Sequence, residues 1–311
     1  MKECILITGG AGFIGSNIAH RLLEEYYNVK IIDNFSTGSK KNIENIIEKV
    51  EFVRGDVRDM KLLKSIMEGV DYVLHQAAIP SVQRSINDPV SSNDANVNGT
   101  LNVLVAAKDT GVKRVVYASS SSVYGDTPTL PKKEDMVPGP KSPYAITKLT
   151  AEYYCKIFYE IYGLETVSLR YFNVFGPGQD PKSEYSAVIP KFITALLKDK
   201  QPTIYGDGLQ TRDFSYIENV VDANILACKA KNASGKIFNI ACGERISLNE
   251  IVDILNKILN KDIKSIYTEP RQGDVKHSLA DISKAKNILG YDPKYGLEAG
   301  LKETIEWYKN E

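Results

Sequence analysis

The sequence is short of the residues that build metal sites and disulfide frameworks. Its 311 residues include only four cysteines and three histidines. The cysteines have no C-x-x-C spacing, which predicts free thiols in a reducing cytoplasm; they are Cys4, Cys155, Cys228 and Cys242. The histidines are far apart and have no partner at ligand spacing, so we expect no bound metal ion; they are His20, His75 and His277.

The chain also lacks an excess of charge and a long apolar run. Lys and Arg together number 39, and so do Asp and Glu. A chain without net charge has no field that attracts nucleic acid and no polybasic anchor for a membrane, so we expect neither partner. No apolar run approaches the roughly 20 residues that span a bilayer. Residues 1–7 continue into Thr8-Gly9-Gly10, which predicts a strand and a turn in place of a signal peptide.

Short apolar runs and amphipathic stretches alternate along the first half of the chain. The runs are rich in β-branched residues, which is typical of parallel strands buried on both faces. They lie at 4–7, 29–32, 51–53, 72–74, 115–117 and 166–169. Helical patterns separate them at 14–26, 61–68, 97–109 and 144–162. The alternation predicts an α/β protein with a Rossmann-type doubly wound parallel sheet.

The pattern loosens after about residue 172. Pro and Gly cluster at 176–181 and 202–208, helical segments follow at 188–198 and 248–259, and residues 237–240 form a late strand. We therefore predict two domains. Residues 1–172 form a nucleotide-binding Rossmann domain, to which 213–242 return. Residues 173–311 form a smaller C-terminal α/β domain for the substrate.

A glycine-rich turn follows the first expected strand. In Thr8-Gly-Gly-Ala-Gly-Phe-Ile-Gly15 the glycines satisfy G-x-G-x-x-G, which lets a pyrophosphate approach the backbone at a helix N-terminus. Asp33 ends the second strand about 20 residues further on, where an acid hydrogen-bonds the adenosine ribose. An acid there repels a 2′-phosphate, so the pattern predicts NAD. Asp56, just after the third strand, is placed to meet the adenine edge.

Tyr144 and Lys148 lie four residues apart at the start of an expected helix. Ser142 suits the N-cap and Pro143 the first helical position, so both side chains leave from one face. A tyrosine with an ordinary pKa of about 10 is a poor base at neutral pH. The ammonium of Lys148 and the positive nicotinamide of NAD⁺ favour the phenolate. Tyr144 could then take a proton from a sugar hydroxyl while the carbon gives up a hydride.

Together with other motifs, these features resemble the extended short-chain dehydrogenase/reductase family, and more closely its UDP-sugar 4-epimerases. The likeness covers nearly the whole chain. The motifs are TGGAGFIGS, DNFSTG, GDVRD, HQAA, NVNGT, SSSSVYG, SPYAITK, RYFNVFGPGQDP, GDGLQTRDFSYIENV and RQGDV. The resemblance implies a tightly held NAD, a UDP-sugar substrate and a homodimer that pairs two helices per subunit, here 97–109 and 144–162.

The resemblance also implies site residues, carried over by motif position. The catalytic residues would be Ser120, Tyr144 and Lys148. The cofactor-binding residues would be Gly9, Gly12, Phe13, Ile14, Gly15, Asp33, Asn34, Ser36, Thr37, Gly38, Asp56, Val57, Gln76, Ala77, Ala78, Asn96, Ser119, Tyr144, Lys148 and Tyr171. The substrate-binding residues would be Ser81, Ser120, Ser121, Tyr144, Asn173, Gln179, Ala187, Val188, Tyr205, Arg212, Arg271, Asp274 and Ser278. Arginines suit diphosphate oxygens, and an aspartate accepts from ribose hydroxyls.

The four serines from Ser119 to Ser122 bear on the reaction. In this family, 4,6-dehydratases carry an Asp-Glu pair just before V-Y-G, and UDP-glucuronate decarboxylases carry a glutamate immediately before it. Here these positions are Ser121 and Ser122, and a hydroxyl of ordinary pKa cannot replace a carboxylate as a base. The simplest remaining path returns the hydride to the opposite face of C4. That path is epimerisation through a 4-keto sugar, without net consumption of NAD.

Individual serines then take separate expected roles. Ser120 would hydrogen-bond the C4 hydroxyl and help relay its proton to Tyr144. Ser121 would line the sugar pocket. Ser278 stands where relatives restricted to glucose and galactose have a tyrosine, and where those that accept N-acetylhexosamines have a small residue.

The sugar is the least determined part of the prediction. Ser278, with Gln179 and Ala187, favours UDP-GlcNAc/UDP-GalNAc with additional activity on UDP-Glc/UDP-Gal. Pro80 stands where the acetylated-sugar branch has a small residue, so a UDP-glucose 4-epimerase is the alternative. A catalytically inactive NAD(P)-sensing regulator of the same fold is a lesser alternative, against which the intact catalytic set speaks.

Overall fold

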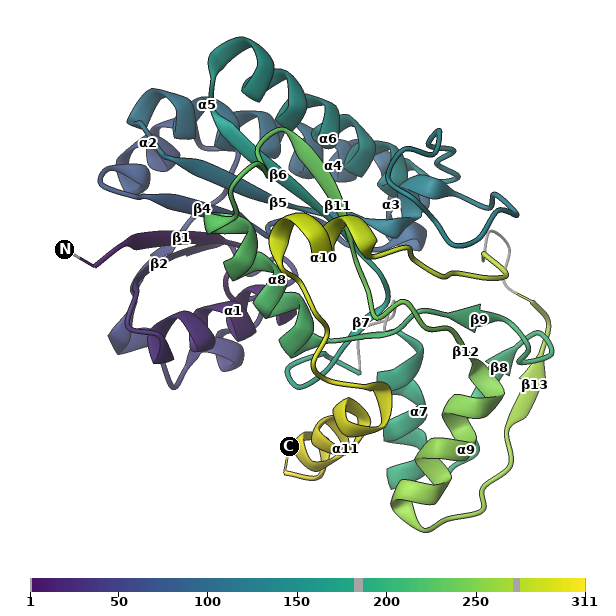
Figure 1. The fold of residues 1–311 in the computed structure, drawn as a ribbon. Coiled ribbons are helices and arrows are strands. Elements are labelled where there is room, and N and C mark those ends of the chain that lie inside the picture. The colour runs from purple at the N-terminus through teal and green to yellow at the C-terminus, as the bar shows by residue number, and fades with distance from the viewer. Residues whose placement is uncertain (1, 182–186, 271–274, 311) are drawn as a thin grey trace.

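The structure is a computed structural model that describes residues 2–181, 187–270 and 275–310. A seven-stranded parallel sheet forms its centre (Figure 1). Across the sheet the strands are β11 (Lys236–Ile240), β6 (Glu165–Tyr171), β5 (Arg114–Ser120), β4 (Tyr72–His75), β1 (Cys4–Thr8), β2 (Asn28–Asp33) and β3 (Glu51–Arg54). The strand order reverses between β1 and β4, which is the doubly wound topology. The predicted fold class is confirmed.

Helices cover both faces of this sheet (Figure 1). One layer holds α2 (Met60–Met67), α5 (Gly99–Thr110) and α6 (Pro143–Tyr162), and the other holds α1 (Phe13–Glu24), α8 (Ile217–Lys229) and α10 (Ser283–Leu289). Successive residues of β1 enter opposite cores: Ile5 and Ile7 pack with the α1 layer, and Leu6 packs with the α2 layer. A strand buried on both faces therefore needs an unbroken apolar sequence.

Two short helices, α3 (Val82–Asn87) and α4 (Pro89–Asn93), lie between β4 and α5, and a π-helical turn at Asp94–Asn98 joins α4 to α5. Both short helices pack against α6. The start of α6 is as the sequence predicts, because the Ser142 side chain accepts from the amide of Ala145 and Pro143 occupies the first turn. These contacts hold the first turn of α6 against the end of β5.

A smaller lobe holds short strand pairs and three helices. Its strands pair as β7 (Val174–Phe175) with β10 (Ser215–Tyr216), β8 (Thr203–Tyr205) with β13 (Ile266–Thr268), and β9 (Thr211–Arg212) with β12 (Ile246–Ser247). Its helices are α7 (Val188–Leu197), α9 (Leu248–Leu259) and α11 (Leu297–Lys309). The chain passes repeatedly between this lobe and the large sheet, since α8, β11 and α10 all lie with the sheet. The division into 1–172 with 213–242, and 173–311, stays a prediction.

No helix in the described ranges combines the length and the apolar character needed to cross a membrane.

Candidate active site

The turn between β1 and α1 presses against the segment that follows β4. Gly9 has a φ of 69°, and a Cβ there would lie 2.7 Å from the Cα of Ala77. A Cβ on Gly15 would overlap the carbonyl oxygen of Gly9. Because α1 has no side-chain N-cap, the amides of its first turn are left for a ligand, and the helix dipole favours an anion there. The predicted residues from Gly12 to Gly15 all lie at this point.

A pocket of about 240 Å³ opens beside the glycine turn, at the carboxyl ends of the neighbouring strands. Nine predicted cofactor residues line it: Gly9, Asp33, Asn34, Ser36, Thr37, Asp56, Val57, Ala77 and Ala78. The sequence did not single out other lining residues, notably Arg58, Ile79, Arg84, Ser91 and Ala95. The side chains that the sequence assigned to an adenosine thus share one pocket.

Asp33 is fixed by backbone groups on both sides. Its Oδ2 accepts from the amide of Ala11 at 2.9 Å, and its Oδ1 accepts from the amide of Phe35 at 2.7 Å. Burial raises the pKa of Asp33, and the two hydrogen bonds oppose that rise. Gly38 lies close by, where a Cβ would meet Ala11 and Asp33. Two backbone amides therefore fix the position of a carboxylate that lines the pocket.

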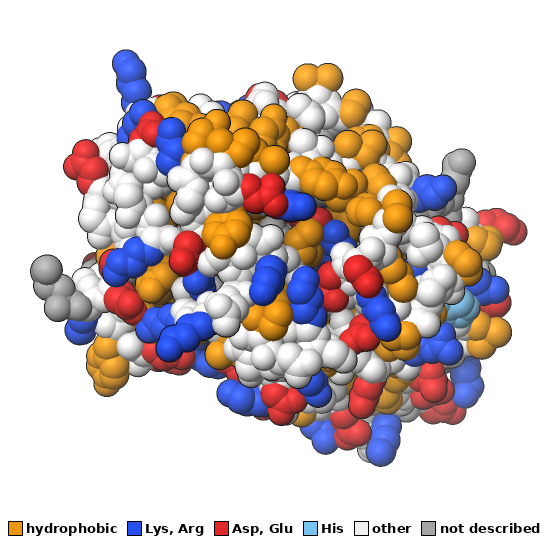
Figure 2. Space-filling view, turned by 45° about the horizontal axis from the view of Figure 1, so that its top comes forward, with side chains coloured by type: hydrophobic (Ala, Val, Ile, Leu, Met, Phe, Trp, Pro, Cys, Tyr) orange, Lys and Arg blue, Asp and Glu red, His pale blue; other side chains and the backbone are white. Residues whose placement is uncertain are grey.

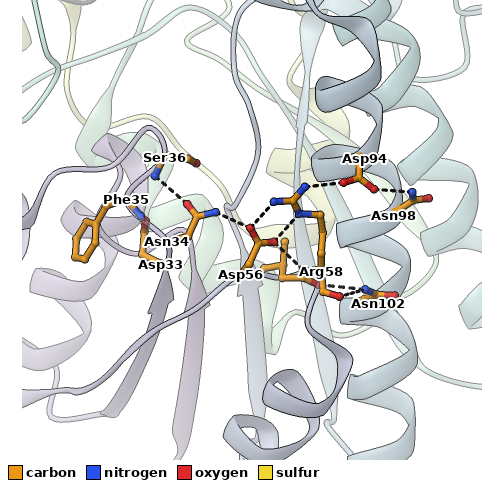
Figure 3. Close-up of polar contacts among 10 residues, drawn as sticks. Asp33, Asn34, Phe35, Ser36, Asp56, Arg58, Asp94, Asn98 and Asn102 are labelled. Carbon is orange, nitrogen blue, oxygen red and sulfur yellow. Dashed lines mark hydrogen bonds and ion pairs between the residues drawn. The ribbon is translucent and has the colours of Figure 1, made fainter.

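Asp56 lies in a network of charges and amides that Figure 3 shows. Its carboxylate accepts from the backbone amide, Nε and Nη2 of Arg58, and from Nδ2 of Asn34 at 2.7 Å. These contacts lower the pKa of Asp56 to about 2, the Arg58 side chain having the largest effect. Arg58 also donates to Asp94 at 2.6 Å. The network joins the ends of β2 and β3 to the π turn before α5.

The three predicted catalytic residues meet where β5 ends and α6 begins. Ser120 is the last residue of β5, and its side chain hydrogen-bonds that of Tyr144. Lys148 is 4% exposed, and its Nζ donates to the carbonyl oxygen of Ala118 at 2.7 Å. The same Nζ lies 5.8 Å from the ring centroid of Tyr144 and 5.1 Å from that of Tyr117.

Burial has the largest effect on the pKa values of this group. Burial raises the pKa of Tyr144, and its hydrogen bond with Ser120 opposes the rise. Burial lowers the pKa of Lys148 to about 8, against the opposing effect of Glu152. For Tyr144, desolvation of the phenolate is the largest influence on the pKa.

Four other predicted cofactor residues have side chains that are engaged with the protein. The side-chain oxygen of Asn96 accepts from the amide of Ile79, and its side-chain nitrogen donates to the carbonyl oxygen of Ile79 and to the hydroxyl of Thr147. The amide nitrogen of Gln76 donates to the hydroxyl of Tyr171 at 3.1 Å and to Asn224 at 2.9 Å. The Ser119 hydroxyl donates to Glu152 at 2.5 Å. We expect these side chains to support the backbone around the site. Any contact of Ser119 with the cofactor would then come from its backbone.

Three predicted substrate residues converge on the segment Thr211–Asp213. Nδ2 of Asn173 donates to the backbone oxygen of Asp213 at 2.9 Å. The amide of Ser278 donates to the backbone oxygen of Thr211 at 3.0 Å, and Arg212 bonds the backbone beside it. The Asp213 carboxylate, which the sequence did not single out, accepts from the amides of Cys242, Gly243 and Ala280. Desolvation raises the pKa of Asp213 to about 6.

The remaining predicted substrate residues lie around this centre. Ser81 caps α3 with a φ of 123°, and Ala187 and Val188 begin α7. Gln179 bonds Val174, and its backbone oxygen accepts from the hydroxyl of Tyr308 on α11. The backbone oxygen of Tyr205, at the end of β8, accepts from Gln210. Arg271 and Asp274 lie outside the described residues.

Comparison with known proteins identifies the family. The family described as "NAD dependent epimerase/dehydratase family" matches residues 5–241. The chain belongs to this family. A UDP-glucose 4-epimerase of Mycolicibacterium smegmatis is 36% identical over 309 residues, covering 98% of each chain.

Two solved structures extend the likeness to the whole fold. The UDP-N-acetylglucosamine 4-epimerase from Methanobrevibacter ruminantium M1, in complex with UDP-N-acetylmuramic acid, is 42% identical with a TM-score of 0.95 over 100% of this chain and 99% of its own. The UDP-glucuronic acid 4-epimerase from Bacillus cereus, solved with UDP-glucuronic acid and NAD, is 35% identical with a TM-score of 0.92 over 99% of each chain. All three relatives are named as 4-epimerases, which are isomerases.

NAD is the cofactor of this family, and the residues present fit it. Gly9, Gly10 and Gly15 have no room for a Cβ, and the uncapped first turn of α1 leaves helix amides for a pyrophosphate. Asp33 is held at the edge of the adjoining pocket, where a ribose with free hydroxyls suits a carboxylate and a 2′-phosphate does not.

Proposed function

We propose that this enzyme is a UDP-sugar 4-epimerase, an isomerase that inverts C4 of the sugar through a transient 4-keto intermediate. The observation that carries the proposal is the meeting of Ser120, Tyr144 and Lys148 at the end of β5, with Ser121 and Ser122 following. This group can move a proton at a hydroxyl, and the two serines supply no carboxylate for elimination or decarboxylation.

Each residue of the group has a separate task. NAD⁺, when bound, supplies a hydride acceptor that returns the hydride, and its positive ring lowers the pKa of a nearby phenol. Tyr144 accepts the proton of the 4-hydroxyl, which passes through the hydroxyl of Ser120. Lys148, held at the Ala118 carbonyl beneath the tyrosine ring, supports the charge of the phenolate.

The serines after Ser120 support epimerisation over other reactions of the family. Ser121 and Ser122 begin a short 3₁₀ helix, Ser121–Tyr124, directly after β5. The Oγ of Ser122 is buried and has no hydrogen-bond partner within the described ranges. A dehydratase needs an acid and a base at these two positions, and neutral hydroxyls cannot serve.

We infer that the preferred substrates are UDP-GlcNAc and UDP-GalNAc, with additional activity on UDP-Glc and UDP-Gal. Ser278 lies beside Thr211 and Arg212, the part of the chain that gathers the predicted substrate residues. A serine leaves room there that a tyrosine would fill. The similar enzyme of Methanobrevibacter ruminantium, named for UDP-N-acetylglucosamine, agrees with this preference.

A UDP-glucose 4-epimerase with little activity on acetylated sugars is the second candidate, and Pro80 favours it. Pro80 is exposed and precedes Ser81, whose φ of 123° is strained for a residue with a Cβ. The proline restricts the backbone next to a predicted substrate residue, which can narrow the pocket. A hexuronate is a poorer fit, because its carboxylate needs a cation and residues 176–189 contain no arginine.

The first test supplies the purified enzyme with UDP-GlcNAc and no added cofactor. We expect UDP-GalNAc to form, because a cofactor that is reoxidised in each cycle stays bound. Release of NADH in proportion to product would overturn the proposal in favour of a net dehydrogenase.

The second test decides the sugar. Ser278→Tyr should lower turnover of UDP-GlcNAc about 10- to 200-fold more than turnover of UDP-glucose, the range that one steric difference in a pocket produces. Ser278→Ala, which keeps the space, is the matched control. Equal effects of Ser278→Tyr on both sugars would remove the support for an acetylated substrate.

We also propose that the enzyme is a homodimer, as its family resemblance implies. Figure 2 shows apolar side chains gathered on the upper face, where α6 lies. On this helix Ile146, Tyr153, Ile157 and Ile161 are between 41% and 66% exposed. Light scattering of Ile157→Glu against Lys156→Glu tests the dimer; only the first should give monomers. Cytoplasmic location stays a prediction from the cysteine pattern.

A further inference from the structure

A buried ion pair lies one turn beyond Lys148 on α6. Glu152 follows Tyr144 and Lys148 at helical spacing, so all three side chains leave α6 on the side of β5 and β6. Oε1 of Glu152 accepts from Nε of Arg170 at 2.9 Å, and Oε2 accepts from Nη2 at 2.7 Å. Both side chains are 2% exposed or less. This arrangement is a two-point charge pair with almost no access to water.

The pair also holds the strand that carries the serines. The hydroxyl of Ser119 donates to Oε1 of Glu152 at 2.5 Å, so one carboxylate oxygen binds both the guanidinium and the residue before Ser120. The guanidinium of Arg170 lies over the ring of Tyr124, with its carbon 4.6 Å from the centroid. Glu152 thus contacts the end of β5 directly, and through Arg170 it is linked to the end of the 3₁₀ helix.

We infer that Glu152 is a positioning residue for the reaction: it fixes Ser119 and thereby Ser120, and it balances the buried positive charge behind Tyr144 and Lys148. This inference rests on the proposed roles of Tyr144 and Lys148. It adds a third residue of α6 to the site, one that contacts neither substrate nor cofactor.

The titratable groups around Lys148 show why one carboxylate matters. They are Tyr144 and Cys155 on α6, His75 on β4, Tyr117 on β5, Tyr124 after β5 and Arg170 on β6. Burial and Lys148 lower the pKa of His75 to about 3, and burial raises the pKa of Cys155 and of Tyr124 to about 12. Burial also raises the pKa of Tyr117.

The tyrosines, His75 and Cys155 are therefore neutral between pH of about 6 and 8, which leaves Lys148, Glu152 and Arg170 as the charged groups among them. Lys284 on α10 faces Arg170 and Glu134 faces Tyr124 from outside this group. Removing the charge of Glu152 leaves two cations without a counter-charge. Tyr144 and Lys148 would then both lose their protons at lower pH, because positive charge favours the phenolate and disfavours the ammonium. Removing the charge of Arg170 should raise the pKa values of both Tyr144 and Lys148.

The test is the pH profile of kcat for epimerisation in four variants. Glu152→Gln should move both limbs of the profile to lower pH by about one unit, and Arg170→Met should move them to higher pH by a similar amount. The double variant Glu152→Gln/Arg170→Met has the same net charge in this layer as the wild type and should return the limbs to the wild-type position, with kcat still lowered because Ser119 is no longer held. Glu152→Asp keeps the charge and should keep the limbs in place.

Glu165→Gln is the matched control. Glu165 also pairs with a buried arginine, Arg114, at 2.6 Å, but at the far end of β5 from Tyr144. It should change stability and leave the pH profile unmoved. The inference would be overturned if Glu152→Gln and Arg170→Met fold but leave the limbs of the kcat profile in place. It would also be overturned if the two variants shift the limbs in the same direction. If Glu152→Gln does not fold, Arg170→Met and the double variant still decide it. Full turnover by Tyr144→Phe would instead refute the proposed role of Tyr144.

Discussion

Different contacts stabilise the two regions of the candidate site: the cofactor pocket, and the region around Asp213 that gathers the predicted substrate residues. In the pocket, Asp33 bonds amides of its own βαβ unit, and Asp56 bonds an arginine two residues away. The predicted substrate residues Asn173, Arg212 and Ser278 come from segments far apart in the chain. Between them, the buried carboxylate of Asp213 accepts from the amides of Cys242, Gly243 and Ala280, with no cation among these partners. Local motifs build the first region, and the folded chain as a whole builds the second.

This contrast has a physical consequence. A carboxylate that faces a guanidinium keeps its charge easily, as the pKa of about 2 for Asp56 indicates. A carboxylate that is buried with only amide partners is charged less easily, because desolvation disfavours its charged form, as the pKa of about 6 for Asp213 indicates. We expect the junction around Asp213 to gain stability as pH falls through about 6, and the ion pair of Asp56 to lose its contribution only as pH falls from about 4 to 2.

The largest effect is expected where the two regions meet, at Tyr144. Tyr144→Phe removes the proton acceptor and keeps the ring against Lys148. We expect kcat to fall by about 10²- to 10⁴-fold, the usual contribution of general base catalysis, while NAD stays bound. Steady-state turnover, with the absorbance of bound NAD as the control, checks this. Turnover near the wild-type rate would mean that another group takes the proton.

Asp213→Asn tests the junction through the pH dependence of stability. The pKa of Asp213 rises from 3.8 to about 6 on folding, so the unfolded chain loses this proton first as pH increases. Between pH of about 4 and 6 the group therefore lowers the free energy of unfolding, by about 3 kcal/mol in total. Urea unfolding should show this decline in the wild type and a smaller one in Asp213→Asn.

The control for that experiment is Asp253→Asn, an exposed aspartate on α9. Its pH profile of stability should follow the wild type. If Asp213→Asn and Asp253→Asn show the same decline with pH, the carboxylate of Asp213 does not destabilise the junction.

Gly15→Ala tests the glycine turn of the cofactor region. A methyl group there overlaps the carbonyl oxygen of Gly9, and backbone cannot move aside as a flexible side chain can. We expect a loss of about 1–3 kcal/mol of stability and at least a tenfold loss of NAD affinity, measured by calorimetry. Gly296→Ala, where a Cβ meets no atom within 4 Å, should change neither. Unchanged NAD binding by Gly15→Ala would separate the turn from the cofactor.

Arg58→Gln should have the smallest effect. Arg58 is half exposed, so its ion pairs with Asp56 and Asp94 are screened by water. The loss of about 0.5–1 kcal/mol predicts a two- to fivefold weaker NAD affinity, because Asp56 is then less firmly placed. Lys64→Gln breaks a surface pair with Asp109 outside the pocket and is the control. Equal NAD affinity in both variants would show that Asp56 needs no arginine.

The strands of the large sheet follow from the sequence, whereas the short strands of the smaller lobe and several helices do not. Each predicted strand of 4–7 through 237–240 overlaps a strand of the sheet, because buried parallel strands have an apolar signal of their own. The helices α3, α4, α8, α10 and α11 were not predicted. The helices α3 and α4 are too short to show a helical period of apolar residues. The helices α8, α10 and α11 mix polar and apolar residues and lie where the chain passes between the sheet and the smaller lobe.

The candidate site divides in the same way. The glycine turn, Asp33, Ser120, Tyr144 and Lys148 stand in motifs whose spacing carries the geometry. Nothing in the spacing marks Arg58 or Asp213 as partners of the site, and nothing indicates that the Ser119 hydroxyl faces Glu152. Their partners come from other elements, so only the packing of strands and helices reveals them.

By itself, the sequence determined the strands of the sheet and the glycine turn, and it supplied the candidate reacting side chains, because these depend on local motifs of the chain. Only the tertiary structure decided their electrostatics. The Tyr144 pKa rises on burial and the Lys148 pKa falls to about 8, since desolvation depends on what covers a group in space. The ion pair of Glu152 with Arg170 likewise exists because α6 packs on β6, a contact that no local pattern encodes.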